Sequence, residues 1–510
     1  MKFAFNMPTK IISGRDVIIC NYKIFSSLGK KAIIVTGRHS AEANGSLADV
    51  LSALKLAGVG YDIFNNIMSN PTIDIVYDGA KFAKEHGDDF VVAIGGGSPM
   101  DAAKAIALLA AQDISRESLF SGKYTDEILP MVFIPTTAGT GSEVTQYSIL
   151  TNDELETKTT LSSPIMFPDY AFLDGKYMCS LGKNTTINTA IDALSHAIEG
   201  FLNKKANEMT AIYSEKAIRI ISSLFKKIEE NDLSLEDRDN LLFASTLAGI
   251  VISHTGTTAV HSMGYSLTYF KDIDHGRANG LLLGRYLEFL YDYIPDKVNE
   301  VLSFMNMNSV SEFKDKLDSL FGEKEKITKE EIVIFVGKAL AAKNLQNSLI
   351  VPGNDDLIKI LEDVFLGAWC IMAINKPPLK KVNILELIFF RYFRTVTNFE
   401  MPRAGSEYPV EIFIKDPFRK SLSFKTPWIG RMYAYAHITK NMKELLELND
   451  VDFKNIRVHL YDWDKEFVLS IEEPKKVLEL QFSCDRNEVR VLLEWCVRVP
   501  EQRYRNDMED

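Results

Sequence analysis

Four residues near the middle of the chain have the types and spacing to hold a metal ion. Asp192 and His196 are four positions apart in a segment of helical periodicity, so their side chains share one helix face. His261 and His275 follow, fourteen positions apart, around a glycine-containing segment. Taken singly, each histidine also fits a core or surface role. Together, one carboxylate and three imidazoles suit a divalent transition metal such as iron or zinc, with room for a substrate oxygen.

Two glycine-rich segments have the composition of phosphate-binding turns. Residues 95–104 read GGGSPMDAAK and residues 135–143 read PTTAGTGSE, and each follows an apolar run. Glycines let the backbone approach a ligand closely, and the free N–H groups that open a helix attract phosphate. The first glycine run alone fits a tight strand-to-helix turn equally well. Two such segments at one edge of a sheet favour a shared anionic ligand.

Four apolar runs predict the strands that position these turns. They cover residues 30–37, 59–67, 89–97 and 131–139. Strands rich in Val and Ile, separated by helical patterns, indicate a mostly parallel sheet with helices on its faces. The ligand of such a sheet lies beyond the carboxyl ends of its strands, where both glycine-rich segments fall.

The rest of the chain divides into a helical part and a strand-rich part. Helical periods predict an all-helical domain over residues 184–394, with helices at residues 187–202, 210–228 and 237–252. Alternating apolar and polar residues predict a strand-rich module over residues 395–510, with one helix near residues 441–448. The strands expected there are residues 409–416, 455–463, 466–473, 476–483 and 488–499. This module could pack on the body, bind a partner or mediate oligomerisation.

The composition argues against several classes of protein. The 510 residues include 58 basic and 69 acidic side chains, a net charge of −11, which disfavours general binding to nucleic acid or to an anionic membrane. The most apolar stretches fall short of the ~20 residues that span a bilayer. No secretory signal is visible, and the five cysteines are scattered without a metal-binding pair. We expect a cytoplasmic protein.

Four motifs occur in an order and spacing that resemble the iron-dependent alcohol dehydrogenase family, over residues 1–393. The motifs are GGGSPMDAAK, PTTAGTGSEVT, AIDALSHAIEG and AVHSMGYSLTYFKDIDHGRANG. The resemblance implies an α/β dinucleotide-binding domain over residues 1–183, an all-α metal-binding domain over residues 184–394, and a metal in the cleft between them. It also implies Fe²⁺, with Zn²⁺ as the alternative, and a small alcohol or aldehyde substrate. We expect a homodimer.

Carried over by position, the resemblance assigns roles to individual residues. The metal ligands would be Asp192, His196, His261 and His275. As catalytic residues we predict His261, Tyr265 and His275, although Tyr265 departs from the family pattern. The cofactor would meet Asn70 near its adenosine, Gly96, Gly97 and Ser98 at its pyrophosphate, Lys158 near its ribose, and the lining residues Asp101, Thr136, Thr137 and Ser142.

A first departure from the family pattern follows the strand over residues 30–37. Many members carry Asp where this chain has Gly37, and an acidic group there accepts a hydrogen bond from the NAD ribose and repels the 2′-phosphate of NADP. Here Arg38 and Ser40 accompany Gly37 instead. We therefore predict that NADP(H) is preferred over NAD(H). Alternatively, Arg38 is only a solvated surface charge.

A second departure is Tyr265, where many relatives have a histidine that is a candidate for relaying a proton to the substrate oxygen. An unperturbed phenol has a pKa near ~10, so Tyr265 is a less ready proton donor at neutral pH. Tyr265 either donates through its phenol or only shapes the pocket. His254 is another candidate relay, or it caps the end of a helix.

The predicted reaction is the interconversion of an alcohol and a carbonyl compound. A metal would act on the substrate oxygen as a Lewis acid, and a nicotinamide would exchange hydride with the carbon. Three alternatives stay open: a zinc-dependent polyol dehydrogenase of the same architecture, a lyase-type cyclase such as dehydroquinate synthase, and a binding or assembly protein whose working part is the strand-rich module.

Overall fold

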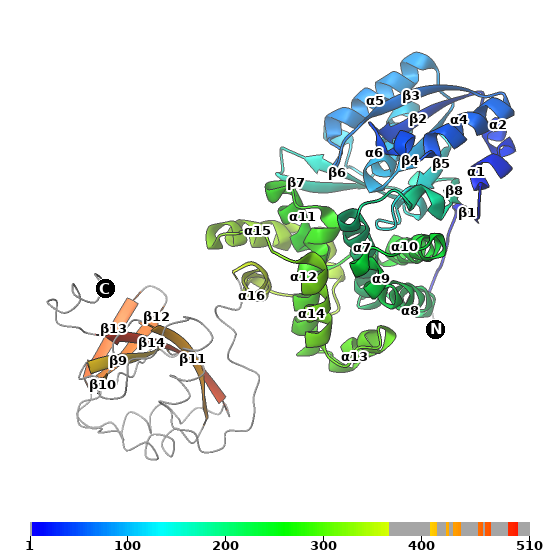
Figure 1. Ribbon diagram of the computed structural model, residues 1–510. Helices are drawn as coiled ribbons and strands as arrows, with labels where there is room; N and C mark the ends of the chain where they lie inside the picture. Colours follow the sequence, from blue (N-terminus) through cyan, green and yellow to red (C-terminus); the bar gives the residue numbers. More distant parts are fainter. Residues whose placement is uncertain are drawn as a thin grey trace, which may run out of the picture. The chain divides into compact units, whose positions relative to one another are not determined.

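The computed structural model describes residues 3–366 and six strands between residues 409 and 497. The chain divides into two compact units, Met1–Gly367 and Ala368–Asp510, and each is described by itself. The first unit contains a parallel sheet with helices on both faces, followed along the chain by a helical part (Figure 1). The predicted α/β arrangement followed by helices is confirmed for this unit, whereas the domain boundary near residue 183 stays a prediction.

A six-stranded sheet with the order β1-β8-β5-β4-β2-β3 forms the first part, and every neighbouring pair is parallel. The strands are β1 (Lys10–Ser13), β2 (Lys31–Gly37), β3 (Gly60–Ile67), β4 (Phe90–Gly95), β5 (Met131–Pro135) and β8 (Tyr170–Leu173). Strands β2 to β5 confirm the four predicted ones. The sequence does not predict β1 and β8, because four residues are too few to show a pattern. It also does not predict the antiparallel hairpin of β6 (Tyr147–Asn152) and β7 (Thr157–Ser162).

Helices cover both faces of this sheet, which explains why its inner strands β2, β4 and β5 are continuous apolar runs. Ile33 and Val35 of β2 belong to a core shared with α5 and α6, whereas Ala32 and Ile34 belong to the opposite core, shared with α1, α2 and α4. The elements are α1 (Val17–Cys20), α2 (Lys23–Leu28), α3 (Ser40–Ala43), α4 (Ser46–Ala57), α5 (Ile73–His86), α6 (Gly97–Ala111) and the short turns η1 (Arg116–Ser118), η2 (Ser142–Val144), η3 (Pro164–Met166) and η4 (Gly175–Met178).

The helical part packs around α7, which contacts α8, α10 and α12. Its elements are α7 (Lys183–Phe201), α8 (Glu208–Ser223), α9 (Phe225–Glu230), α10 (Leu235–Thr255), α11 (Ala259–Lys271), α12 (His275–Tyr291), α13 (Pro295–Phe304), α14 (Val310–Phe321), α15 (Lys329–Ala341), η5 (Lys343–Asn347) and α16 (Asn354–Phe365). The three predicted helices are confirmed, the second being split into α8 and α9. Among residues 3–366, no single helix is long and apolar enough to cross a membrane; α10 and α11 reach that measure only as a pair bent by 107°.

The described strands of the second unit are antiparallel. They are β9 (Pro409–Lys415), β10 (Lys425–Pro427), β11 (Met432–Thr439), β12 (Arg457–Asp462), β13 (Lys465–Ser470) and β14 (Glu488–Val497). Four of them pair in the order β10-β9-β14-β11, and β12 pairs with β13. The strand predicted at residues 476–483 and the helix predicted near residues 441–448 lie outside the described residues. The strand-rich module as a domain stays a prediction.

Candidate metal centre and cofactor cleft

One cavity of about 1280 Å³ lies beyond the carboxyl ends of β2, β4 and β5. Segments that follow these strands form one wall, and residues of α7, α11 and α12 form another. The predicted residues that line it are Gly37, Ser40, Asn70, Gly96, Gly97, Ser98, Asp101, Thr137, Ser142, Lys158, Asp192, His196, His261, Tyr265 and His275. Residues that belong to separate motifs therefore meet around one space.

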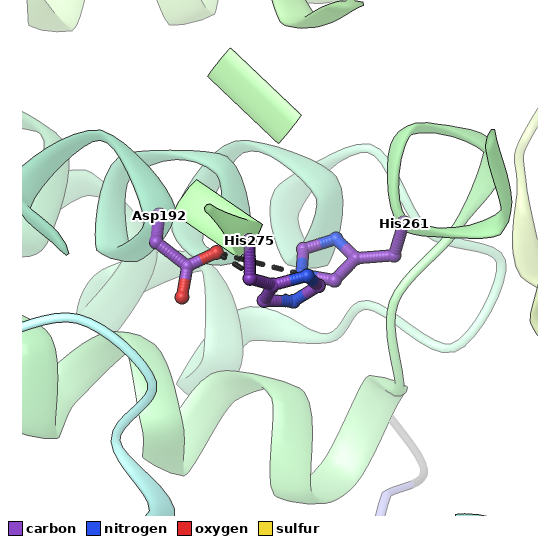
Figure 2. Close-up of side chains that lie close together, drawn as sticks. All are labelled: Asp192, His261 and His275. Carbon is purple, nitrogen blue, oxygen red and sulfur yellow. Dashed lines mark ion pairs between the residues drawn. The ribbon is translucent and has the colours of Figure 1, made fainter. Parts of the chain in front are cut away.

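Three helices carry the predicted metal ligands, and Figure 2 shows Asp192, His261 and His275 close together. Asp192 and His196 lie on α7. His261 lies in the first turn of α11, and His275 is the first residue of α12. Oδ1 of Asp192 is 3.8 Å from Nε2 of His261 and 3.9 Å from Nε2 of His275. Ligand atoms of Asp192, His261 and His275 all lie within 4.8 Å of one another. The structure does not bring His196 into this group, although its Nε2 lies 2.9 Å from Nε2 of His261.

This donor set fits a divalent metal ion. Asp192, His196 and His261 are buried, and within residues 3–366 the ion-pair partners of Asp192 are imidazoles, with no Lys or Arg side chain among them. A buried carboxylate without a permanent cationic partner is costly. Two facing imidazole nitrogens also repel each other through their lone pairs unless a cation or a proton lies between them. Fe²⁺ and Zn²⁺ both accept this combination of nitrogen and oxygen ligands.

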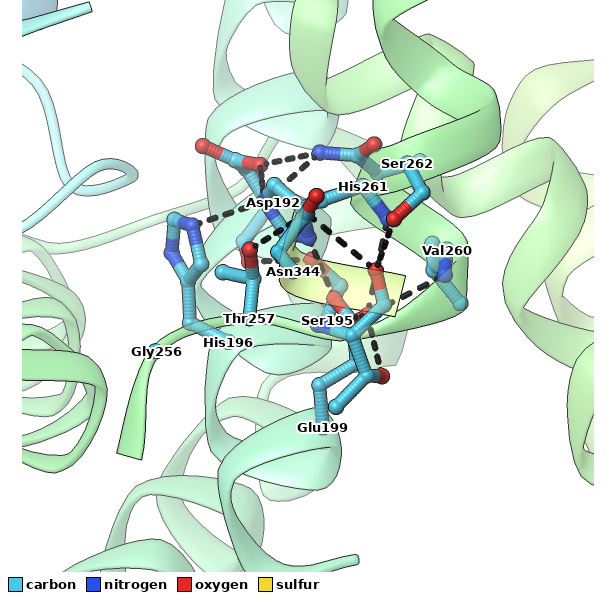
Figure 3. Close-up of polar contacts among 12 residues, drawn as sticks. Asp192, Ser195, His196, Glu199, Gly256, Thr257, Val260, His261, Ser262 and Asn344 are labelled. Carbon is cyan, nitrogen blue, oxygen red and sulfur yellow. Dashed lines mark hydrogen bonds and ion pairs between the residues drawn. The ribbon is translucent and has the colours of Figure 1, made fainter. Parts of the chain in front are cut away.

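Glu199, which the sequence analysis does not single out, holds His261 in place (Figure 3). One oxygen of its buried carboxylate accepts hydrogen bonds from the backbone N–H of Thr258 (2.9 Å) and of Val260 (3.1 Å) and from the Thr258 hydroxyl (2.6 Å). The other oxygen is hydrogen-bonded to Nδ1 of His261. Glu199 therefore caps α11 and leaves Nε2 of His261 free to bind a metal. Its position seven residues after Asp192, on the same helix face, is the signal that could have revealed it.

The electrostatics of the cluster favour the metal-binding form of Asp192, His196 and His275, whereas they favour protonation of His261. Burial raises the pKa of Asp192, but the imidazoles outweigh it and hold that pKa below its ordinary value. Burial lowers the pKa of His196 and lowers the pKa of His275 well below its ordinary value. For His261, burial lowers the pKa, and the Glu199 carboxylate outweighs burial and raises it. His196 and His275 are therefore neutral imidazoles at neutral pH, the form that binds metals.

The glycine-rich turn after β4 has the geometry of a phosphate site. A side chain on Gly96 would lie 2.9 Å from Oγ1 of Thr137, and one on Gly97 would lie 2.6 Å from Cγ2 of Thr140. Glycine therefore allows the two motifs to touch. Helix α6 begins at Gly97 with neither a side-chain cap nor an acidic residue in its first turn, so its N–H groups are available to an anion.

Lys104 is a buried cation that ties the two glycine-rich motifs together. Its fully buried ammonium donates hydrogen bonds to the hydroxyls of Ser142 (2.7 Å) and Thr145 (3.1 Å) and to the carbonyl oxygen of Tyr147 (2.7 Å). Ser142 in turn donates to Asp101 (2.6 Å). Burial lowers the pKa of Lys104 to about 8. Lys104 lies inside the first motif, but nothing in the sequence distinguishes it from a surface lysine.

Three residues with a role predicted from the sequence do not line the cavity: Arg38, Thr136 and His254. Within residues 3–366, Arg38 is exposed, Thr136 is buried, and neither lines the cavity. His254 stacks on Phe5, with ring centroids 4.3 Å apart, and its Nε2 accepts a hydrogen bond from the backbone of Asn6 (3.2 Å). His254 therefore anchors the N-terminal segment.

Tyr265 lies beside the metal ligands. Its ring stacks on that of His275, with centroids 6.0 Å apart, and meets the ring of His261 edge-on at 6.5 Å. Burial raises the pKa of Tyr265 well above its ordinary value, so the phenol stays protonated at neutral pH. This favours the interpretation that Tyr265 shapes the pocket.

Comparisons with known proteins agree with this geometry. The model of iron-containing alcohol dehydrogenases matches residues 8–175, and that of the C-terminal part of the Fe-containing alcohol dehydrogenase family matches residues 186–365. The chain is 33% identical over 285 residues to 1,3-propanediol dehydrogenase of Citrobacter freundii, covering 55% of this chain and 73% of that one. It is 27% identical over 385 residues to NADPH-dependent butanol dehydrogenase of Clostridium saccharobutylicum, covering 71% and 98%. A crystal structure of an iron-containing alcohol dehydrogenase from Thermotoga maritima matches with a TM-score of 0.67 and 39% identity, covering 71% and 99%.

The chain belongs to the iron-containing alcohol dehydrogenase family, which confirms the resemblance of its motifs. It is therefore an oxidoreductase of the alcohol dehydrogenase type. The family implies iron, a nicotinamide cofactor and small alcohols or aldehydes as substrates.

Replacing Glu199 tests how the metal site is held. We expect Glu199→Gln to weaken Fe²⁺ binding by ~10- to 100-fold, because the amide removes the charge that orients His261. The measurement is a Fe²⁺ titration of the metal-depleted protein under anaerobic conditions. Glu215→Gln, the same change at a half-buried residue on α8, serves as the control and leaves the affinity unchanged. Equal Fe²⁺ affinity in Glu199→Gln and the unmodified protein would show that Glu199 has no such role.

Proposed function

We propose that the protein interconverts small aldehydes and alcohols with NADP(H), using Fe²⁺ held by Asp192, His196, His261 and His275. The observation that supports this most directly is the convergence of Asp192, His261 and His275, with His196 against His261, in the cavity that the glycine-rich turn also lines. In this proposal, residues 1–183 bind the cofactor and residues 184–394 bind the metal, while residues 395–510 have no assigned role. Zn²⁺ fits the same ligands and is the alternative metal.

When bound, the metal supplies Lewis-acid polarisation of a substrate oxygen and the nicotinamide supplies hydride. The residues of the chain bind and orient the reactants. Gly96, Gly97 and the N-terminus of α6 hold the pyrophosphate through backbone N–H groups. Lys158, half-buried in the cavity wall, approaches the ribose, and burial lowers its pKa to about 8. Tyr265, as a neutral phenol, fills the wall beside the metal ligands and excludes water.

The proposed preference for NADP(H) rests on the end of β2. Gly37 and Ser40 line the cavity and carry no negative charge that would repel a 2′-phosphate. Arg38, next to Gly37, is exposed and adds a positive charge beside this end of β2, although it does not line the cavity. The site also has room for a side chain, since a Cβ on Gly37 would lie 3.5 Å from the carbonyl oxygen of Ile67.

Removing one ligand tests the proposed metal chemistry. We expect His261→Ala to contain no bound iron and to show no aldehyde-dependent oxidation of NADPH, because three groups at a distorted site hold the ion too weakly. Elemental analysis after anaerobic purification and an NADPH assay with short aldehydes measure the two effects. His86→Ala, an exposed change in α5, retains both. A metal-free His261→Ala protein with full turnover would refute the proposal.

The cofactor preference is tested by restoring the acidic group. We expect Gly37→Asp to lower the ratio of kcat/KM for NADPH to that for NADH by at least ~10-fold, because a like charge beside the 2′-phosphate is strongly unfavourable. Gly182→Asp places the same residue at an open, exposed position before α7 and leaves the ratio unchanged. If kcat/KM of the unmodified protein for NADH equals or exceeds that for NADPH, the predicted preference for NADP(H) is wrong, whatever the variant shows.

A further inference from the structure

Asn279 lies against three of the four metal ligands, although no motif analysis assigns it a role. It is fully buried on α12, one helical turn after His275. Its side-chain nitrogen Nδ2 is 2.9 Å from Oδ1 of Asp192, 3.0 Å from Nε2 of His261 and 3.2 Å from Nε2 of His275. A neutral amide donor therefore points at the atoms that would bind the ion.

The contact with Asp192 is the one compatible with a bound metal. An amide nitrogen carries two hydrogens, so Asn279 cannot donate fully to all three neighbours. The Nε2 lone pairs of His261 and His275 are needed for the ion. Oδ1 of Asp192 has more than one lone pair, so it can accept a hydrogen bond from Asn279 and bind a cation at the same time.

The carboxamide oxygen of Asn279 indicates that the predicted ligands impose the orientation in which Nδ2 faces Asp192. Its Oδ1 is buried and has no hydrogen-bond partner among the described residues, which is unfavourable by itself. The reversed amide would point Oδ1 at the Asp192 carboxylate and repel it. The space for Oδ1 exists only because residue 264 is glycine, since a Cβ there would lie 2.2 Å from Oδ1.

We propose that Asn279 is a positioning residue that fixes the rotation of the Asp192 carboxylate, so that Asp192 binds the metal through one oxygen. This inference rests on the proposed metal site. A carboxylate anchored in this way leaves a coordination position open for the substrate oxygen, as catalytic metal sites require. Gly264 contributes by leaving room for the Asn279 carboxamide.

The test uses Co²⁺ as a probe, because its visible absorption reports the number and arrangement of its ligands. The full-length protein, depleted of metal, is titrated with Co²⁺ alongside Asn279→Leu, which has a similar shape and no donor. We expect the dissociation constant to rise by ~10- to 100-fold and the absorption band to change in position or intensity. Gly264→Ala displaces the Asn279 carboxamide without replacing it, and we expect it to shift the Co²⁺ dissociation constant and the absorption band in the same direction. This variant tests the proposal if Asn279→Leu does not fold.

Thr268→Val is the matched control, since it alters a buried side chain of α11 whose hydroxyl has no partner among the described residues. It leaves the Co²⁺ affinity and spectrum unchanged. An unaltered spectrum in folded Asn279→Leu and Gly264→Ala would overturn the positioning role, whatever happens to thermal stability. Failure of the unmodified protein to bind Co²⁺ would instead overturn the metal site itself, so the two failures are distinguishable.

Discussion

The rest of the site depends on the meeting of three helices at one buried carboxylate. The ion-pair partners of Asp192 in residues 3–366 are imidazoles, so these rings, the charge of nearby Lys158 and a cation, when bound, compensate its charge. Helix α12 comes close enough to α7 because Gly276 follows His275. A side chain at residue 276 would lie 2.0 Å from the carbonyl oxygen of Asn188 on α7. A backbone contact between helices therefore determines where an imidazole meets a carboxylate.

The predicted ligands are held by groups that lie outside the predicted ligand set. Glu199 holds His261 and at the same time caps α11, so the fold of this helix and the orientation of the ligand share one carboxylate. The ring of His196 is tied through Nδ1 to the carbonyl oxygen of Gly139 at 3.3 Å. Because Gly139 belongs to the second glycine-rich motif, this bond joins the metal centre to the cofactor side of the cleft. Lys104 of the first motif donates a hydrogen bond to Ser142 of the second. These bonds connect the cofactor-binding turn to the predicted metal centre.

The sequence predicts those features that repeat or that carry rare residue types. Strands β2, β4 and β5 are recognisable because burial on both faces makes them continuous apolar runs, and the scarce histidines point to the predicted metal ligands. The role of Glu199 is not apparent, because carboxylates are common in helices and its partners lie at the start of another helix. Arg38 illustrates a different difficulty. Its position after β2 is predictable, but adjacency in sequence does not determine whether a side chain faces a cavity or solvent.

The most direct test of the account is the iron K-edge X-ray absorption fine structure of the full-length protein, loaded with Fe²⁺ under anaerobic conditions. The account predicts nitrogen and oxygen neighbours without sulfur, and outer-shell scattering from three imidazole rings. Sulfur among the nearest neighbours, or an outer shell without imidazole scattering, would contradict the assignment of Asp192, His196, His261 and His275 to one ion.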